Sequence, residues 1–206
     1  MSFCLIEEKK VGEIRLIFTQ NSFILDKNIF FLTEKEKIRL QTFSTEKRKK
    51  EYIGVIALKN YFFEKEEIIY NDHGAPLLLN QKNKFISISH SYIYIGMILA
   101  DFKVGLDIER ISDKIKRVTS KFISEKEAHS FNIDSEEEMT RIWTMKEVIY
   151  KIASTPGLNI KEHIQIELKN DVYFGHVFIQ EQWYVTEITT FVKDNYIFSF
   201  NTQALV

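Results

Sequence analysis

The sequence predicts an α+β fold built from two similar halves, each a small antiparallel sheet packed with helices. Three observations lead to this prediction. Segments with alternating apolar residues are typical of strands, and turn sequences separate them. Amphipathic segments that begin with a capping box are typical of helices. Residues 31–36 (FLTEKE) also resemble residues 122–127 (FISEKE), so the chain contains a weak internal repeat.

The first half is predicted to combine strands with a pair of helices. The helices begin at a serine or threonine that can cap a helix, and the strands end at turn residues. The predicted elements are a strand at 13–18, a helix at 33–43, a helix from 44 or 45 to about 64, a turn at 71–76, and strands at 85–89 and 92–100.

The second half is predicted to begin with a strand and to end in a strand-rich tail. Residues 101–103 make a tight connection, so we expect a hairpin between the strand at 92–100 and a strand at 104–109. The later elements are a helix from 124, a long helix at 135–153 that stops at 154–157, and three or four strands within 163–203.

The repeat predicts how the halves are organised. The N-terminal half (1–102) and the C-terminal half (103–206) are expected to form one integrated, pseudo-dimeric unit. They would pack about a pseudo-twofold axis, with the active site at their junction, a natural position for a ligand cleft. The alternative is that capping boxes are common, so that any two pairs of helices resemble each other.

Composition excludes several classes of function. The chain has 206 residues, of which 45% are hydrophobic and 28% charged, as in soluble globular proteins. Its net charge of −1 argues against nucleic acid as a partner. Charged residues at 7–10 interrupt any signal peptide, and the longest apolar stretch, 93–100, is too short to cross a membrane. Because Cys4 is the single cysteine, we expect a reducing, cytoplasmic location.

Two acidic residues share one face of a predicted strand. In residues 104–109 (VGLDIE) apolar side chains alternate with the others, so Asp107 and Glu109 point the same way. Gly105 has no side chain, which would let a ligand or a helix approach. Taken alone, the two carboxylates are most simply an exposed polar face.

The long helix offers a third carboxylate. Trp143, Glu147 and Lys151 recur every four residues and lie on one face. Glu147 and Lys151 alone are a pair that commonly supports a solvated helix. With the two strand carboxylates, however, they form a cluster that needs a cation. A hard divalent cation that holds a phosphate suits these oxygen ligands, and Trp143 could form a wall of the site.

Two other segments could bind phosphate. Residues 86–91 (ISISHS) place hydroxyls and an imidazole at a strand end. A nucleophilic mechanism with Ser89 or Ser91, His90 and Asp107 is not preferred, because adjacent Ser and His side chains on a strand point to opposite faces and no nucleophile elbow is present. The basic run 47–50 (KRKK) is either a solvated helix face or a docking point for one phosphate.

Glu127 has two interpretations. As the third residue after Ser124 it completes a capping box. As a carboxylate near a metal site it could act as a general base. The sequence favours the cap, and the two roles do not exclude each other.

Together these motifs resemble the signature of the 4′-phosphopantetheinyl transferases. Residues 104–109 and 143–147 (WTMKE), with Lys151 four residues on, are similar to the paired motifs of that family. Residues 85–91 resemble its Asn-x-Ser-His-Ser segment, and residues 73–76 (HGAP) resemble its Gly-Lys-Pro turn. The likeness covers about residues 44–160. The length resembles the monomeric, surfactin-synthetase-activating branch.

The resemblance implies an activity and a site. Such an enzyme moves the phosphopantetheine arm of coenzyme A to a serine of an apo acyl or peptidyl carrier protein and releases adenosine 3′,5′-bisphosphate. By position, Mg²⁺ would be held by Asp107, Glu109 and Glu147. Catalytic roles, with Glu127 as the base for the incoming serine, would fall on Glu127, Glu147 and Lys151. Contacts to coenzyme A would come from Arg48, Ser89, His90, Asp107, Lys146 and Lys151.

Three positions depart from the family pattern. Ala75 stands where a turn lysine is common, Val55 where many relatives carry arginine, and Ser87 where asparagine is common. The first two remove positive charge from the nucleotide pocket, so we expect weaker coenzyme A binding or other phosphate partners. A second hypothesis is therefore a catalytically weak relative that binds coenzyme A or a carrier protein without turnover. An unrelated hydrolase is a third.

Overall fold

The computed structural model describes residues 6–20, 32–63 and 66–206, and it confirms the predicted α+β class. All strand pairs are antiparallel, and helices pack on the sheets. The chain divides into two compact units, residues 1–101 and 102–206. No helix in the described ranges is long and apolar enough to cross a membrane.

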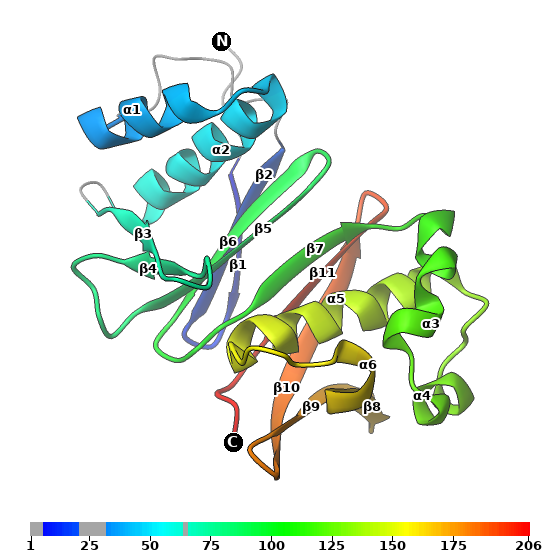
Figure 1. Ribbon diagram of the computed structural model, residues 1–206. Helices are drawn as coiled ribbons and strands as arrows, with labels where there is room; N and C mark the ends of the chain where they lie inside the picture. Colours follow the sequence, from blue (N-terminus) through cyan, green and yellow to red (C-terminus); the bar gives the residue numbers. More distant parts are fainter. Residues whose placement is uncertain (1–5, 21–31, 64–65) are drawn as a thin grey trace. The chain divides into compact units, whose positions relative to one another are not determined.

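In the described part of the first unit, a four-stranded sheet is accompanied by two helices (Figure 1). Its elements are β1 (Glu7–Val11), β2 (Ile14–Gln20), α1 (Glu34–Thr42), α2 (Glu46–Phe62), β3 (Ile68–Tyr70), β4 (Pro76–Leu78), β5 (Phe85–Ser91) and β6 (Tyr94–Ala100). The strand order is β1-β2-β6-β5, and β3 and β4 form a separate pair. Val55 and Leu58 of α2 pack against Ile17, Ile95 and Met97 of the sheet.

Local sequence explains the ends of these elements. Thr33 and Glu36 form the predicted capping box of α1, and Thr45, not Ser44, caps α2. The predicted end of the second helix near residue 64 lies outside the described residues, and α2 ends at Phe62. In the predicted turn, the Asn71 side chain accepts hydrogen bonds from two backbone amides, and Gly74 has a φ of +78° that favours glycine.

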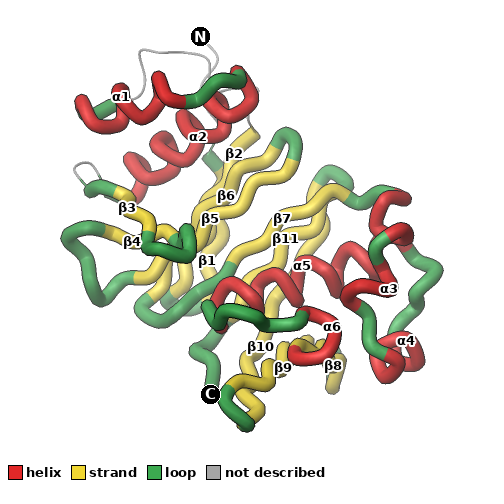
Figure 2. The backbone as a smooth tube through the Cα atoms, in the orientation of Figure 1, coloured by secondary structure: helices red, strands yellow, loops and turns green. Residues whose placement is uncertain are grey.

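The second unit is a five-stranded sheet crossed by one long helix, which Figure 2 shows in red over the yellow strands. Its elements are β7 (Leu106–Arg110), the 3₁₀ helix η2 (Asp113–Arg117), α3 (Thr119–Phe122), α4 (Glu125–Ser130), α5 (Glu136–Ala153), α6 (Ile160–His163), β8 (Ile164–Lys169), β9 (Val172–Ile179), β10 (Gln182–Lys193) and β11 (Tyr196–Asn201). The strand order is β7-β11-β10-β9-β8. The strand-rich tail is therefore confirmed, with four strands.

One predicted connection is wrong. We expected residues 101–103 to close a hairpin between the strands on either side, but β6 pairs with β2 and β5, whereas β7 pairs with β11. The connection instead passes from one sheet to the other. The Asn201 side chain holds it in place, because its amide donates to the Lys103 carbonyl and its carbonyl accepts from the Gly105 amide.

The core of the second unit lies between α5 and the sheet. Ile142, Met145 and Ile149 of the helix are fully buried against strand residues such as Ile164 and Val177. Burying each such side chain contributes about 1.5–3 kcal/mol of hydrophobic free energy. This packing makes α5 and the sheet one rigid support for polar side chains at their edge.

Each unit contains the same buried ion pair, which supports the predicted repeat. In the first unit the capping-box residue Glu36 lies 2.8 Å from the Lys59 amine. In the second, the capping-box residue Glu127 lies 2.8 Å from the Lys146 amine. Both lysines come from the longer helix that follows. Phe31, the first residue of the first copy, lies outside the described residues.

Candidate active site

Strand β7 presents two carboxylates to α5. Asp107 is opposite Ser199 in the register of β7 and β11, and Glu109 is opposite Ile197. The Ser199 hydroxyl contacts α5, so this is the helix-facing side of the sheet. The alternation that the sequence predicted therefore holds, and both acidic side chains project toward the same helix.

Gly105 explains how α5 approaches this strand so closely. A Cβ atom added to Gly105 would lie 2.7 Å from the Val148 carbonyl oxygen and 3.1 Å from Ile152 Cγ2. Such distances are too short for any residue with a side chain. Of the two possibilities that the sequence left open, a ligand or a helix, it is the helix that needs this glycine.

Lys151 joins the helix to the strand by direct contacts. Its amine donates to the Asp107 carboxylate at 2.8 Å and to the Leu106 carbonyl oxygen at 2.7 Å. Asp107 is only 6% exposed. A positive charge at this position offsets part of the negative charge that the carboxylates concentrate there.

Glu147 shows the electrostatic consequence of this crowding. Its pKa is raised to about 7, first by burial and then by the charge of Asp107; Lys151 acts in the opposite direction, and Glu109 adds a smaller rise. The three carboxylates are therefore near enough to influence one another, as the sequence predicted. An added cation would relieve this repulsion.

The donor set fits a hard divalent cation such as Mg²⁺, which prefers one or two carboxylates plus phosphate oxygens and water. Across residues 6–20, 32–63 and 66–206, no group of three or more His, Cys, Asp or Glu side chains is already arranged to hold a metal ion. The Lys151 amine takes up an Asp107 oxygen that a cation would use. The residue types therefore suit Mg²⁺, although they do not form a closed protein cage.

Trp143, which the sequence placed beside the site, packs into the core. Its ring meets the Phe122 ring edge-to-face, with 5.1 Å between the ring centroids. Trp143 is partly buried against the cluster of apolar side chains that α5 forms with the sheet. We find it to be a support for α5.

Lys146 and Glu127 are buried together and lie in the body of the second unit. Lys146 is 0% and Glu127 2% exposed. Their charged groups are 2.8 Å apart, and burial lowers the pKa of Lys146 while Glu127 opposes this effect. Glu127 also completes the capping box with Ser124, so the structure favours the capping interpretation of this residue.

A buried hydroxyl network behind the site was not predicted. Thr144 of α5 and Ser199 of β11 lie 2.7 Å apart, and Ser199 donates to Thr190 of β10 at 3.2 Å. In the sequence, each of these residues can be recognised only as a polar residue at a position where its helix or strand is expected to be buried. Sequence spacing alone does not show that such residues meet.

In the first unit, a basic group surrounds one carboxylate. The Glu51 carboxylate lies 3.2 Å from Arg48, 3.8 Å from Lys47 and 3.6 Å from His90. Arg48 and His90, which the sequence separated by half the unit, are thus brought together. Glu51 was missed, although its spacing of three and four residues from Arg48 and Lys47 on a helix was a usable signal.

Ser89 lies on the other face of β5. His90 is exposed, whereas Ser89 is buried at 7%, as expected for neighbours on a strand. The structure therefore brings His90 and Arg48 together, but not Ser89. Val55, which the sequence assigned to a nucleotide pocket, is 7% exposed and packs in the core of the first unit.

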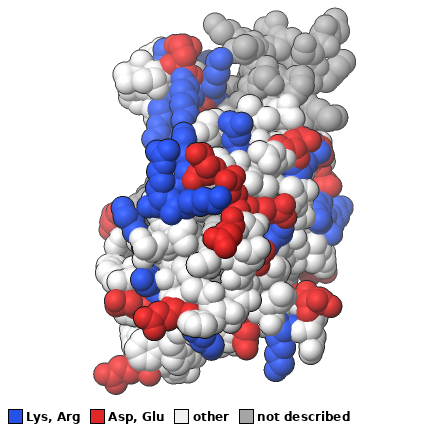
Figure 3. Space-filling view, turned by 90° about the vertical axis from the view of Figure 1, so that its right-hand side faces the viewer, with Lys and Arg blue, Asp and Glu red and all other residues white. Residues whose placement is uncertain are grey.

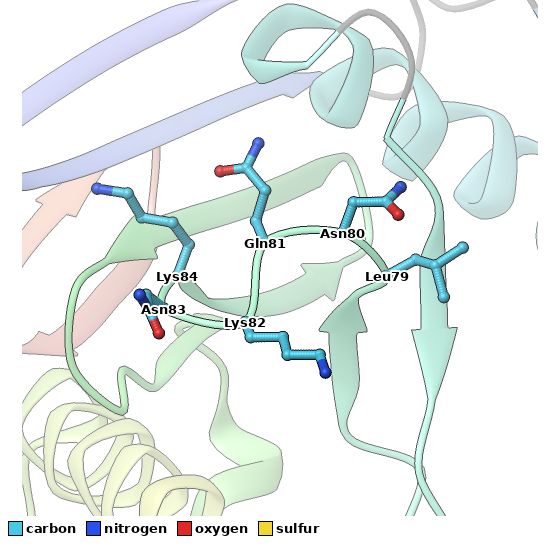
Figure 4. Close-up of a pocket in the computed structure, with 6 residues that line it drawn as sticks. All are labelled: Leu79, Asn80, Gln81, Lys82, Asn83 and Lys84. Atoms are coloured by element: carbon cyan, nitrogen blue, oxygen red, sulfur yellow. The ribbon is translucent and has the colours of Figure 1, made fainter.

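The loop between β4 and β5 borders a hollow of about 700 Å³, lined by residues 79–84 (Figure 4). Figure 4 shows that the side chains of Gln81 and Lys82 point in opposite directions from the loop, so they do not converge on one ligand. Lys84 pairs with Asp101, and Asn80 donates to Glu66. We do not regard this loop as a catalytic site.

A comparison with protein families identifies the second unit. Residues 103–198 match the 4′-phosphopantetheinyl transferase superfamily, and this segment contains Asp107, Glu109, Glu147 and Lys151. No curated protein matches the chain. The carboxylates lie on β7 and α5, and both elements fall within the matched segment. The chain therefore carries a 4′-phosphopantetheinyl transferase superfamily domain at residues 103–198, as predicted, whereas its place in the monomeric two-half branch stays a prediction.

Proposed function

We propose that this protein transfers the 4′-phosphopantetheine arm of coenzyme A to a serine hydroxyl of an apo acyl or peptidyl carrier protein. The observation that carries the proposal is the cluster of Asp107, Glu109, Glu147 and Lys151 within the matched domain. Phosphoryl transfer depends mainly on positioning and on neutralising charge, and this cluster can do both.

The reaction exchanges one phosphorus–oxygen bond for another. The serine oxygen attacks the β-phosphorus of coenzyme A, and the bond from that phosphorus to the bridging oxygen breaks. Adenosine 3′,5′-bisphosphate leaves with the bonding electrons, and the serine proton passes to a base. Negative charge therefore builds up on the leaving phosphate, where a positive neighbour is most effective.

Asp107, Glu109 and Glu147 are proposed to hold Mg²⁺ on the pyrophosphate. When bound, this ion supplies the charge neutralisation that the leaving phosphate needs. Lys151 is proposed to exchange its present contact with Asp107 for a phosphate oxygen. Because Lys151 lies on α5 one turn after Glu147, its amine stays beside the carboxylates before and after this exchange.

The basic group of the first unit is proposed to bind the phosphates at the nucleotide end of coenzyme A. Arg48 and His90 carry donors suited to phosphate oxygens, and Glu51 orients both. In the turn at residues 71–76, where the family commonly has a lysine, Ala75 supplies no charge. We therefore expect Lys47 to compensate, since its side chain is 78% exposed and lies within the same group.

The remaining features concern partners and location. We propose a protein that works in the cytoplasm, which the single cysteine supports, and a monomer, as the resemblance to the two-half branch implies. On the face in Figure 3, many blue Lys and Arg side chains gather in one area beside red acidic side chains, and others are scattered over the rest of the face. A small basic group suits one phosphorylated ligand better than a nucleic acid, which needs a broad basic surface.

A second candidate is a relative that binds coenzyme A or a carrier protein without turnover. Ala75 favours it, because the turn lacks a lysine. The two candidates differ in one measurable result, since only the enzyme converts the carrier.

The test is a panel of apo carrier proteins from fatty-acid, polyketide and peptide synthesis, each incubated with the protein, coenzyme A and Mg²⁺. Intact-protein mass spectrometry should show one phosphopantetheine added to at least one carrier. A parallel calorimetric titration measures coenzyme A binding. Tight binding without any mass gain supports the second candidate. If neither binding nor a mass gain is observed, both candidates are excluded.

A further inference from the structure

The buried pair of Lys146 and Glu127 has no room for a substrate. One Glu127 oxygen accepts from the Ile166 amide at 2.9 Å. The other accepts from the Ser124 amide at 2.9 Å, the Ser124 hydroxyl at 2.8 Å and the Lys146 amine at 2.8 Å. A general base must reach the proton that it removes. Both Glu127 oxygens already accept hydrogen bonds from groups of the protein itself.

The Lys146 amine connects separate elements. Besides Glu127, it donates to the backbone carbonyls of Phe122 at 2.6 Å, Ile164 at 2.7 Å and Ile160 at 3.3 Å. These acceptors belong to the end of α3, the start of α6 and the start of β8. One ammonium group therefore fastens α5 to two parts of the chain, the end of α3 and the adjoining starts of α6 and β8.

This attachment controls the direction of the next side chain. Successive residues of a helix differ by about 100° in direction, so fixing Lys146 against the body of the unit fixes where Glu147 projects. The opposite side of the helix is fixed by the close approach of Val148 to Gly105. Glu147 lies between these two attachments, on the side that faces Asp107.

We propose that Lys146 and Glu127 form a buried clamp that positions Glu147 for metal binding, and that Glu127 is not the base of the reaction. The metal-binding part stands on the geometry of the second unit alone. The part about the base rests on the proposed function. Lys146 and Glu127 are thus positioning residues. They do not make the contacts to coenzyme A and to the incoming serine that the resemblance implied for them.

The first experiment tests metal binding without any reaction. In Glu127→Gln/Lys146→Met both charges are removed, so no charge is left buried without a counter-ion. We expect its affinity for Mn²⁺, measured by electron paramagnetic resonance, to fall about 10- to 100-fold, the usual effect of losing support for a metal ligand. The matched control is Glu36→Gln/Lys59→Met, which removes the equivalent pair in the first unit. It should bind Mn²⁺ like the wild type.

Equal Mn²⁺ affinity in the two double variants would overturn the clamp. If Glu127→Gln/Lys146→Met does not fold by circular dichroism, Lys146→Arg replaces it. This variant keeps the charge and the donors but changes their reach, so a measurable loss of Mn²⁺ affinity is expected. Wild-type affinity in Lys146→Arg would contradict the proposal equally.

The second experiment tests the assignment of the base. Glu127→Gln preserves shape and a capping acceptor, and we expect kcat within about tenfold of the wild type. Loss of a general base costs about 10²–10⁴-fold in rate. A fall of more than about 100-fold in kcat, with KM and Mn²⁺ affinity unchanged, would show that Glu127 is the base and overturn this part. If the wild type modifies no carrier, the proposed function fails, while the Mn²⁺ comparison still decides the clamp.

Discussion

Gly105 determines how closely α5 can approach β7. Any Cβ at this position would lie 2.7 Å from the Val148 carbonyl oxygen, which is backbone and has no rotamer to change. The helix would have to move away from the strand that carries Asp107. The site therefore requires glycine, which has no side chain, at position 105.

We therefore predict that Gly105→Ala lowers the free energy of unfolding by about 1–3 kcal/mol, the usual cost of overpacking. It should also weaken Mn²⁺ binding, because Glu147 moves with the helix. The control is Gly175→Ala, whose Cβ would meet the Ile149 and Ile188 side chains in the core. That variant should lose stability in urea unfolding but keep its metal affinity. Unchanged affinity in Gly105→Ala would contradict the argument.

Glu147 makes stability depend on pH in the metal-free protein. Its pKa is raised from 4.5 to about 7 in the folded state. The folded protein therefore holds this proton more tightly than the unfolded chain does. The stabilisation is fully present below about pH 4.5 and is lost as the pH rises through about 7.

We predict that Glu147→Gln removes this dependence. In the presence of a chelator, the variant should be more stable than the wild type at pH 8, while the difference should shrink or vanish at pH 4.5. Urea unfolding at both values measures it. A wild type that gains stability relative to the variant between pH 4.5 and 8 would show that Glu147 is not crowded by the other carboxylates.

At the scale of elements, α5 and β11 are joined by hydroxyl groups. Thr144 and Ser199 are both fully buried and lie 2.7 Å apart. Removing either hydroxyl loses this hydrogen bond, which costs about 0.5–1.5 kcal/mol, while Thr144 keeps its contact to the Arg141 carbonyl and Ser199 its contact to Thr190. Because both single variants lose the same hydrogen bond, the double variant loses it only once.

We predict that Thr144→Val and Ser199→Ala each lower the free energy of unfolding, and that the double variant loses less than the two single losses added together. Urea unfolding of the four proteins gives the coupling. Strict additivity would show that the two hydroxyls do not interact, even though their elements touch.

The sequence predicts the individual helices and strands better than it predicts which strands pair with each other. Helix α5, its Ser135 cap and the four strands of the tail follow from local periodicity and capping. Strands β3 and β4 have three residues each, too few to show a period, and β1 (EEKKV) has the composition of a surface segment. The pairing of β7 with β11 joins distant parts of the chain, so no local signal contains it.

The same limit applies to the site. Asp107, Glu109, Glu147 and Lys151 could be found because strand and helix periods place each pair on one face. The partners of Lys146 could not be found, because three of its four are backbone carbonyls, which every residue possesses. The burial seen in the structure distinguishes Lys146, whose amine binds backbone carbonyls inside the protein, from Lys151, whose amine faces the carboxylates.

In the whole molecule, the two units carry different chemistry on antiparallel sheets packed with helices. Each has a capping-box glutamate paired with a buried lysine, and the second adds a carboxylate cluster within the segment that matches the transferase family. The first adds a basic group around Glu51. A net charge of −1 shows that neither sign dominates the chain, so recognition depends on these local groups.

The proposed phosphopantetheine transfer depends on the carboxylates of the second unit. The most direct test compares wild type, Asp107→Ala and Asp113→Ala, an exposed aspartate of η2, with coenzyme A, Mg²⁺ and a carrier that the wild type modifies. Intact mass should show the added arm with wild type and Asp113→Ala but none with folded Asp107→Ala. Wild-type modification of the carrier by Asp107→Ala would contradict the assigned site.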